Sequence, residues 1–557
     1  MPLNLASPGI VVREVDLTQG RVDPTSTKAG GLVAPFAKGP VEKPTLIETE
    51  ADLLETFGAP YKDNNHYEYW LTASSYLAYG GVLRVVRSNE SGLKNGFVGS
   101  ASSVTIKSDD DYTNKGYGEN TISGVVVAGK NPGTWSNGIK LAMLDGLADQ
   151  IITGIDTTAV LGFSSTANGG LAAVAGYENG ISDLNLTVGL GVTQAVPSGT
   201  VVAGVGATSL LDGYLKGVIT EVGNGQVSVK LVSHVSAAGT ETAVEYTPGG
   251  VYEFQNSGSF KVHVQSGVGA GQLGWVASTV SYGSSFAASS FLTALTGAGI
   301  TALDPRYVAA QAYDGEVAYT GATDWFDNQT ITLNNGDTIS WNSLADRPGT
   351  SSYAAARNAK NDEVHVALLD DTGKITGNAG TLLEKFVAGS KAKDAILSTG
   401  TASYWRKLLE VASEYVFGGG APSGTVTVDL DASFNPKSDV AWDQEAEDVS
   451  FAAIGNYQAS LAGGKDYGGK TSIETADALK VSVGDLSTGY NLLSNKDAYE
   501  LDFLLMGSGA HGREATQALA NKLVSIAELR KDCVACISPW RGAFLATSGD
   551  GEDLTLS

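Results

Sequence analysis

The chain has 557 residues and a formal net charge of −24, because 60 Asp and Glu outnumber 36 Lys and Arg. This length suits three or four domains, and the lack of a basic tract argues against nucleic acid as a partner. The start resembles no signal peptide and no run approaches roughly 20 apolar residues, so we expect a soluble cytoplasmic protein without membrane insertion.

The first predicted element is a lone strand that follows a turn at residues 7–9. It has no nearby hairpin partner and is followed by a polar, glycine-containing linker at 20–31. We therefore predict that it joins another sheet, including one in a neighbouring molecule. An edge strand on its own chain is the alternative. The strand residues are Ile10, Val11, Val12, Arg13, Glu14 and Val15.

Residues 29–87 have the pattern of a compact α/β element. Strand-like stretches at 31–40 and 44–49 precede a predicted helix at 64–81, and a buried strand is expected at 82–87. The face predicted to be buried on the helix consists of Trp70, Ala73, Leu77 and Ala78.

Helical periodicity nearly vanishes from about 96 to 344. Short strand-like runs alternate there with Gly, Ser, Asn and Thr turns, as in the segment 225–246. Residues 151–289 are the most glycine- and alanine-rich and the least charged part of the chain. Because the α/β pattern resumes near 346, we expect one or two β-rich domains inserted in an α/β fold.

Residues 464–471 match the phosphate-loop pattern G-x-x-x-x-G-K-[ST]. A phosphate loop lies between a buried strand and a helix, but the preceding "NYQASLAGG" lacks a β-branched apolar run. The best magnesium-binding acids, Asp370 and Asp371, lie upstream. We therefore favour an exposed glycine-rich surface loop over an ATP site. The residues at the fixed positions of the pattern are Gly464, Gly469, Lys470 and Thr471.

A second glycine pattern, G-x-G-x-x-G, begins at Gly507 between a predicted strand at 501–506 and a predicted helix at 513–530. A further strand at 533–538 completes a βαβ unit, but Ser538 and Pro539 occupy the place of the ribose-binding acid. We therefore expect a tight strand-to-helix turn and no NAD. The other pattern glycines are Gly509 and Gly512, and the buried helix face is predicted to be Ala515, Leu519, Leu523 and Ile526.

The remaining polar clusters match no catalytic or metal motif. Cys533 and Cys536 lack partners for a four-ligand zinc site and lie on a predicted strand, so we expect buried structural thiols. The acidic clusters at 109–111 and 429–448 do not have calcium-loop spacing and are expected to be solvated loops. We expect no metal, no cofactor and no enzymatic activity.

Several stretches, in their order and spacing, resemble the tail sheath proteins of contractile-tailed bacteriophages. They cover nearly all of the chain except about 150–290. The matching stretches are "SPGIVVREVD" at 7–16, "KGPVEKPTLI" at 38–47, "YEYWLTASSYLAYGGVLRVVR" at 67–87, "KNPGTWSN" at 130–137, 347–386, "NKDAYELDFLLMGSG" and "IAELRKDCVACISP".

The resemblance implies a structural role without nucleotide use. Sheath subunits polymerise with six-fold symmetry around a tail tube, and a baseplate signal releases a metastable extended state. The implied partners are further copies of the chain, the tube protein, and the baseplate and tail terminator proteins. The implied location is the virion tail, after assembly in the host cytoplasm. Sheaths of phage-derived bacteriocins or contractile secretion machines are the close alternative, and a nucleotide-binding enzyme using residues 464–471 is the alternative of another class.

The expected fold is α+β and multidomain, with a discontinuous α/β core and inserted β-rich, sandwich- or barrel-like domains. Known sheaths continue past the position of "CISP" with further helices, strands and a C-terminal arm, whereas this chain stops at "ATSGDGEDLTLS", so we expect a fragment. A differently closed C-terminal domain is the alternative. The expected parts are an N-terminal arm at 1–22 that joins the C-terminal domain, a core at 23–95 and 345–485, a β-rich domain at 96–150 and 290–344, an outer β-rich insertion at 151–289, and an incomplete C-terminal α/β domain at 486–557.

Overall fold

The computed structural model of the chain shows an α+β protein with several separate sheets. The chain divides into two compact units: unit 1 comprises 1–92 and 473–557, and unit 2 comprises 93–472. The predicted arm strand, Ile10 to Val15, lies outside the described residues. The structure describes residues 28–62, 66–155, 186–196, 200–201, 210–256, 260–263, 315–317, 319–432, 434–437 and 442–542.

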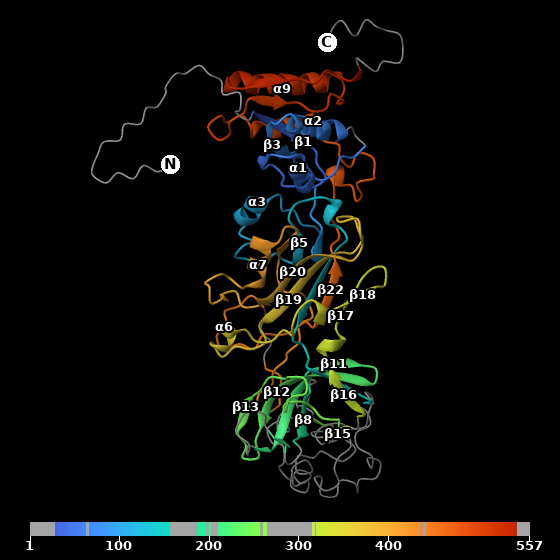
Figure 1. The fold of residues 1–557 in the computed structure, drawn as a ribbon, viewed down its shortest axis with the longest axis vertical. Coiled ribbons are helices and arrows are strands. Elements are labelled where there is room, and N and C mark those ends of the chain that lie inside the picture. The colour runs from blue at the N-terminus through green and yellow to red at the C-terminus, as the bar shows by residue number, and fades with distance from the viewer. Residues whose placement is uncertain are drawn as a thin grey trace, which may run out of the picture. The chain divides into compact units, whose positions relative to one another are not determined.

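Unit 1 is built on a five-stranded sheet with the order β2-β3-β1-β23-β24. Figure 1 labels β1 and β3 of this sheet together with helices α1, α2 and α9. Strand β1 is parallel to β3 and β23, β23 is parallel to β24, and β2 is antiparallel to β3. Helix α2 packs on β1 and β3, whereas α9 packs on α8 and β24. The elements are β1 (Ala29–Ala34), β2 (Thr45–Ile47), α1 (Glu50–Phe57), α2 (His66–Ala78), β3 (Val82–Arg87), α8 (Val483–Asn491), β23 (Phe503–Leu505), α9 (Arg513–Arg530) and β24 (Val534–Cys536).

The helices of unit 1 follow local sequence signals. The predicted helix at 64–81 is α2, and Trp70, Ala73 and Leu77 are buried as expected, whereas Ala78 is exposed. Helix α1 was not predicted from its sequence. Its signal is a capping box, in which the Thr49 hydroxyl accepts the N–H of Asp52 and the Asp52 carboxylate accepts the N–H of Thr49.

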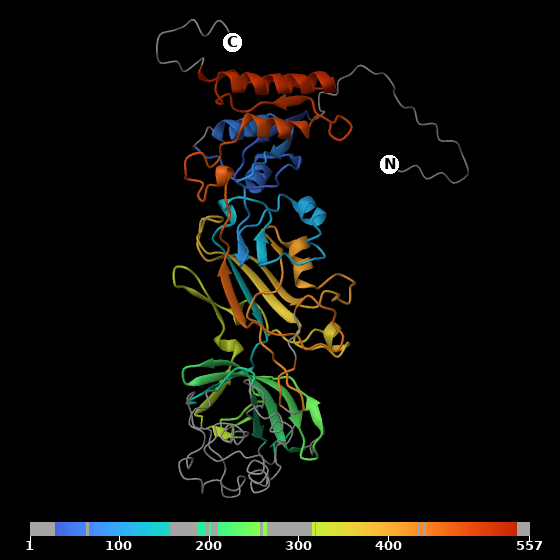
Figure 2. The same ribbon diagram turned by 180° about the vertical axis from the view of Figure 1, so that it is seen from behind.

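Unit 2 consists mainly of antiparallel strands in several sheets, seen from both sides in Figures 1 and 2. One sheet has the order β20-β19-β6-β22, a second has β21-β5-β4, and a third has β15-β14-β8-β11-β12-β7-β16 with β13 paired to β12. Two further two-stranded sheets pair β9 with β10 and β17 with β18.

The strands of unit 2 are β4 (Phe97–Gly99), β5 (Val125–Gly129), β6 (Ile139–Asp145), β7 (Gln150–Thr153), β8 (Gly191–Ala195), β9 (Thr200–Val201), β10 (Leu210–Leu211), β11 (Tyr214–Gly223), β12 (Gln226–Val235), β13 (Glu241–Ala243), β14 (Phe260–His263), β15 (Gly315–Val317), β16 (Gly321–Asp324), β17 (Thr330–Thr332), β18 (Thr338–Ser340), β19 (Glu363–Asp370), β20 (Thr381–Ser390), β21 (Val416–Gly418) and β22 (Asn456–Ser460). Its helices are α3 (Asp109–Asn114), α6 (Ser352–Ala355), α7 (Trp405–Ala412) and the 3-10 turns η2 (Thr134–Ser136), η4 (Phe326–Asn328), η5 (Trp341–Ser343) and η6 (Tyr467–Gly469).

The observed division of the chain differs from the expected one. Residues 345–472 share unit 2 with 93–344 and do not join 29–87, because β6 pairs with both β19 and β22. Strands β6 and β19 bury apolar side chains on both faces, and Tyr457 and Ala459 of β22 pack against the same core, so no boundary falls near 345.

The C-terminal elements also differ from the expected separate domain at 486–557. Strand β23 pairs in parallel with β1, so the βαβ element formed by β23, α9 and β24 completes the N-terminal sheet. The β-rich sheet of unit 2 likewise exceeds the expected insertion at 151–289, because it begins with β7 and includes β16.

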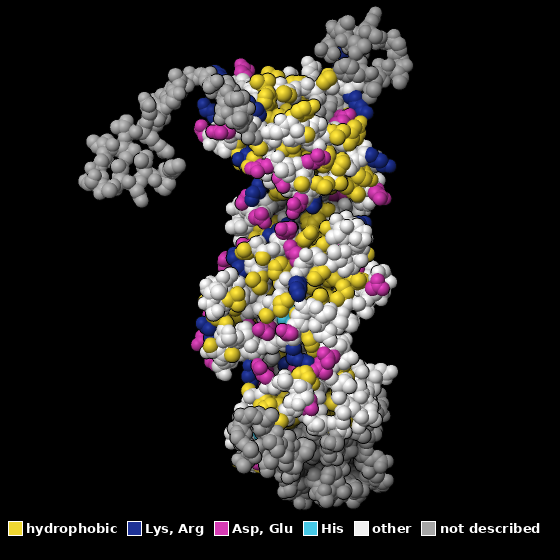
Figure 3. Space-filling view, in the orientation of Figure 1, with side chains coloured by type: hydrophobic (Ala, Val, Ile, Leu, Met, Phe, Trp, Pro, Cys, Tyr) yellow, Lys and Arg dark blue, Asp and Glu magenta, His cyan; other side chains and the backbone are white. Residues whose placement is uncertain are grey.

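Acidic, basic and apolar side chains are interspersed on the face shown in Figure 3. Among the described residues, no helix has both the length and the apolar character that a membrane crossing requires.

Candidate functional site

The glycine-rich loop at 464–471 is held in place by contacts within unit 2. The N–H of Gly464 donates to Oδ1 of Asn137 at 2.8 Å, and Nδ2 of Asn137 donates to the Gly464 carbonyl at 3.0 Å. The carboxylate of Asp466 accepts the N–H of Thr134 at 2.9 Å and its hydroxyl at 2.6 Å. The backbone of Gly464 and the Asp466 side chain are therefore engaged with protein groups.

The surroundings of this loop also differ from those of a phosphate loop. A strand, β22, does precede it, contrary to the sequence reading, but β22 is antiparallel to β6. No helix follows Thr471 until α8 begins at Val483. The expectation of an exposed loop is wrong in part, because Asp466 and Tyr467 are buried whereas Thr471 is exposed.

The two acids considered for magnesium stabilise turns. Oδ2 of Asp370 accepts the N–H groups of Ile375 and Thr376 at 2.9 and 2.7 Å. Asp371 accepts the N–H of Asn334 at 2.8 Å and the hydroxyl of Ser460 at 3.1 Å. Oδ2 of Asp370 and both oxygens of Asp371 therefore accept hydrogen bonds, whereas Oδ1 of Asp370 is buried without a partner among the described residues.

The second glycine motif forms the predicted strand-to-helix turn between β23 and α9. Gly507 has a φ of +76°, and a Cβ at this position would lie 2.4 Å from a ring carbon of Tyr69. A Cβ on Gly509 would lie 2.1 Å from the Pro539 carbonyl oxygen. The N–H of Arg541 donates to the Gly509 carbonyl at 3.1 Å. The chain after β24 therefore makes the close approach to the turn that a pyrophosphate makes in a dinucleotide site.

A polar cluster beside this turn was missed by the sequence reasoning. Arg541 Nη1 lies 2.9 Å from Oε1 of Glu68, and the Ser508 hydroxyl donates to the same carboxylate. The Tyr69 hydroxyl and Nε2 of His511 are 2.5 Å apart. Burial lowers the pKa of His511 and raises that of Tyr69. These contacts join α2 to the turn, and their sequence separation of about 440 residues left no local signal.

The cysteines are not buried, contrary to expectation. Cys533 is half-buried and Cys536 is exposed, because β24 lies at the edge of the sheet. Within the described part of the chain, no group of three or more His, Cys, Asp or Glu could hold a metal ion. The acidic cluster at 109–111 forms the first turn of α3, which begins after the capping residue Ser108.

The edge of the unit 1 sheet carries exposed apolar side chains at its C-terminal end. Among the described strands, β24 pairs only with β23. Val534 is 59% exposed and Ile537 is 40% exposed. An edge strand with exposed apolar side chains can accept a further strand from another chain.

Comparison with known proteins gives partial matches. The chain is 36% identical over 86 residues to the tail sheath protein of Enterobacteria phage T4, across 15% of this chain and 13% of that protein. It is 31% identical over 144 residues to the tail sheath protein of Vibrio phage KVP40, across 23% of this chain and 21% of that protein. These matches confirm the resemblance to phage tail sheath proteins, although they span about a fifth or less of the relatives' length.

The other comparisons add little. No protein-family model matches the chain. The solved sheath tail protein Lin1278 from Listeria innocua aligns with 91% of this chain and 84% of that one at 11% identity, with a TM-score of 0.14. A score this low supports no conclusion about the fold.

Proposed function

We propose that this chain, with its similarity to phage tail sheath proteins, is a structural subunit of a contractile tail sheath. It polymerises with six-fold symmetry around the tail tube and contracts from a metastable extended state to drive the tube through the host envelope. Its partners are further copies, the tube protein, and the baseplate and tail terminator proteins, in a virion assembled in the host cytoplasm. The observation that carries this proposal is the pair of sheath matches. A bacteriocin or secretion-machine sheath is the alternative of the same class.

The proposed mechanism needs no catalytic site. A head-to-tail interface that does not close generates a helical polymer. A kinetic barrier can hold such a polymer in a metastable state, and many bistable subunits that each release a few kcal/mol produce a large stroke.

Sliding subunits need tethers, and we assign one to the N-terminal arm. The strand-prone residues Ile10 to Val15 would add to the unit 1 sheet of a neighbouring copy, which is where the C-terminal elements lie. The exposed edge at β24 offers the backbone and apolar groups that such a strand requires.

A nucleotide-binding enzyme is disfavoured by the geometry of both glycine motifs. The loop at 464–471 has backbone and carboxylate groups engaged by Asn137 and Thr134, and the turn at Gly507 is approached by Pro539. We therefore propose a non-enzymatic role without a cofactor.

Electron microscopy of the purified full-length protein tests the function. Under polymerising conditions, hollow striated tubes or rods are expected; persistent monomers that never form ordered polymers would contradict the proposal.

The arm is tested with Val12→Pro, which removes one N–H from the added strand and fixes φ, against Val12→Ala, which keeps both the N–H and φ freedom. The proline subunit should melt like the wild type yet form no stable tubes. Normal assembly and contraction by Val12→Pro sheaths would exclude the arm as a tether.

A further inference from the structure

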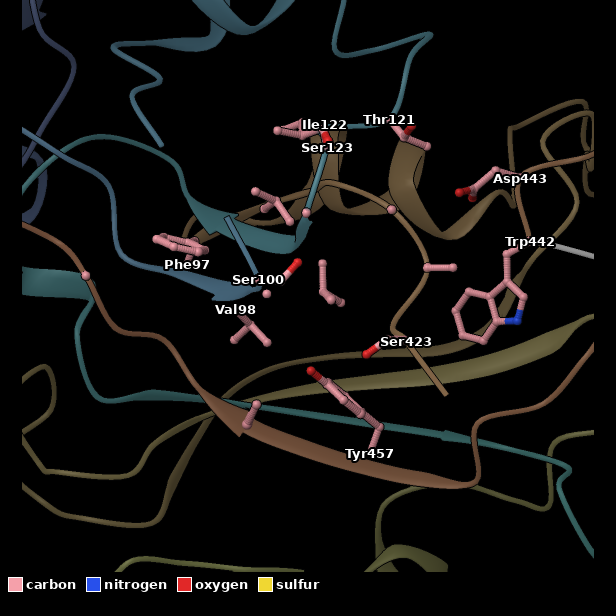
Figure 4. A pocket seen from close by; sticks show the side chains of 18 of the residues that line it. Phe97, Val98, Ser100, Thr121, Ile122, Ser123, Ser423, Trp442, Asp443 and Tyr457 are labelled. Carbon is pink, nitrogen blue, oxygen red and sulfur yellow. The ribbon is translucent and has the colours of Figure 1, made fainter. Parts of the chain in front are cut away.

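A groove opens in unit 2 between strands β4 and β22 (Figure 4). The start of β4 lies beside the chain just after β22, and the two strands then separate. Phe97 of β4 and Ala462, just after β22, exchange two backbone hydrogen bonds of 2.9 and 3.0 Å. Continued in the same register, Gly99 would face Ser460. These residues do not pair, and both line a cavity of about 1140 Å³.

The separation has a local cause in β4. A bulge lies between Val98 and Gly99, and Gly99 has a φ of +146°. The next two N–H groups, of Ser100 and Ala101, both donate to the Gly124 carbonyl, so β4 turns toward β5. Strand β22 instead follows β6.

The divergence leaves one edge of β22 open. The N–H of Leu461 donates to the Ile139 carbonyl, and the N–H of Asp145 donates to the Gly455 carbonyl, so odd-numbered residues face β6. Because backbone groups alternate along an antiparallel strand, the N–H and C=O groups of Gln458 and Ser460 point away from β6. In the described part of the chain, these groups make no backbone hydrogen bond on that side.

The lining of the groove is almost uncharged. Figure 4 shows the hydroxyl groups of Ser100, Ser423 and Tyr457 directed toward its middle. Among the described residues that line it, Asp443 is the one carboxylate and none is Lys, Arg or His; Asp443 accepts the Tyr404 hydroxyl at 2.6 Å. An extended, uncharged segment therefore meets no unpaired charge here, whereas a strongly acidic one would find no cation.

The cavity also exceeds the roughly 300–1,000 Å³ of usual small-molecule sites. An open strand edge is satisfied best by the backbone of another strand, because only a strand offers donors and acceptors at the same repeat.

We propose that the β22 edge accepts an extended, uncharged segment from a second copy of this chain as an added strand. This inference rests on the proposed function, which supplies a second copy at high local concentration. The chain contains sequence of the required kind, since residues 264–303 include no Asp, Glu, Lys or Arg.

Amide hydrogen exchange at single-residue resolution tests the proposal on the wild-type full chain. In isolated subunits the N–H groups of Gln458 and Ser460 should exchange quickly, whereas that of Leu461 should exchange slowly. In assembled tubes the first two should slow by at least about tenfold. If tubes form while Gln458 and Ser460 exchange as fast as in the subunit, the inference is wrong and the sheath function stands.

Two other results would also overturn it. Protection of Ser460 already present in isolated subunits and lost on exhaustive dialysis would identify a small ligand as the occupant. If the protein forms no ordered polymer at all, that result contradicts both the proposed function and this inference.

A matched pair of variants gives an independent readout. Ser460→Pro removes the outward N–H, whereas Ser460→Ala removes only the hydroxyl and its bond to Asp371. Ser460→Ala should polymerise like the wild type, and Ser460→Pro should reduce tube yield at least about tenfold. Equal yields from both variants would contradict the added strand; if Ser460→Pro does not fold, the wild-type exchange measurement decides.

Discussion

The two partners of a buried ion pair in unit 2 should be strongly coupled, so that removing both costs clearly less stability than the sum of the two single losses. Nζ of Lys391 lies 2.7 Å from Oδ2 of Asp145, and both side chains are fully buried. The same ammonium donates to the carbonyls of Asn361 and Ala452 at 2.9 and 3.0 Å, so all three of its donors have acceptors. The Asp145 carboxylate also accepts the N–H groups of 454–455.

Lys391→Met introduces an unbranched side chain of similar length but without charge, and it leaves the Asp145 carboxylate buried without its counter-charge. Loss of one partner of a buried pair costs about 3–5 kcal/mol. Adding Asp145→Asn removes the stranded charge and keeps an acceptor for the backbone N–H groups. The double variant should therefore be less destabilised than the sum of the single changes by at least about 2 kcal/mol.

Urea unfolding of the four proteins in this cycle measures both quantities. Tryptophan fluorescence is a suitable probe, because the Lys391 ammonium lies 5.0 Å from the ring centre of Trp442, which contacts Trp405 edge to face. The reasoning is refuted if Lys391→Met lowers the free energy of unfolding by less than about 1 kcal/mol, or if the effects of the two substitutions are strictly additive. Either result would mean that the two buried charges do not depend on each other.

Three further outcomes follow from unit 1 and the loop at 464–471. Burial lowers the pKa of His66 from 6.5 to about 4, so the folded state binds fewer protons than the unfolded state between these values. Unit 1 should lose about 3 kcal/mol as pH falls from above 6.5 to below 4, and His66→Asn should flatten that dependence in melting experiments. Gly507→Ala places a Cβ against the Tyr69 ring and should lower the free energy of unfolding in urea by more than about 2 kcal/mol. The control Gly512→Ala has a similar φ, +87°, but no atom within 4 Å of the new Cβ, and should cost about 1–2 kcal/mol. Equal losses in the two variants would show that the contact with Tyr69 is unimportant. Millimolar ATP-Mg should leave the melting temperature unchanged. A ligand present at 100 times its Kd would stabilise the fold by about 2.7 kcal/mol, so binding would be visible. A rise in melting temperature that is abolished in Lys470→Ala would establish a nucleotide site.

The sequence was sufficient where a signal is local. The period of 64–81 predicted α2, and the pattern around Gly507 predicted the turn between β23 and α9. Strand β22 was missed because Asn456 and Gln458 occupy one face, where they bond to the β17–β18 hairpin. Its pattern therefore lacks the apolar run that marks a buried strand.

Long-range pairing carried no local signal, and this is why the domain boundaries were misplaced. Strand β1 pairs with β23 across more than 450 residues, and β6 pairs with β22 across more than 300. Periodicity identifies a strand as buried but does not identify its neighbour. The change in sequence pattern near 345, from short strand-like runs to an α/β pattern, occurs within unit 2 and does not mark the boundary between the two units.

The two glycine motifs show why a sequence pattern needs structural partners before it indicates a ligand. Glycine provides the same freedom of close approach whether the neighbour is a phosphate or another part of the chain. At Gly464 the neighbours are the Gly133 carbonyl and Asn137, and at Gly509 the neighbour is the Pro539 carbonyl. Each neighbour lies on a different element from its glycine. The Gly464 partners are more than 300 residues away, so no window of sequence around that motif contains them, and Pro539 approaches Gly509 only because β24 pairs with β23. The groove along β22 has the opposite character: it carries no motif, but its unpaired backbone edge predicts a partner strand directly from geometry.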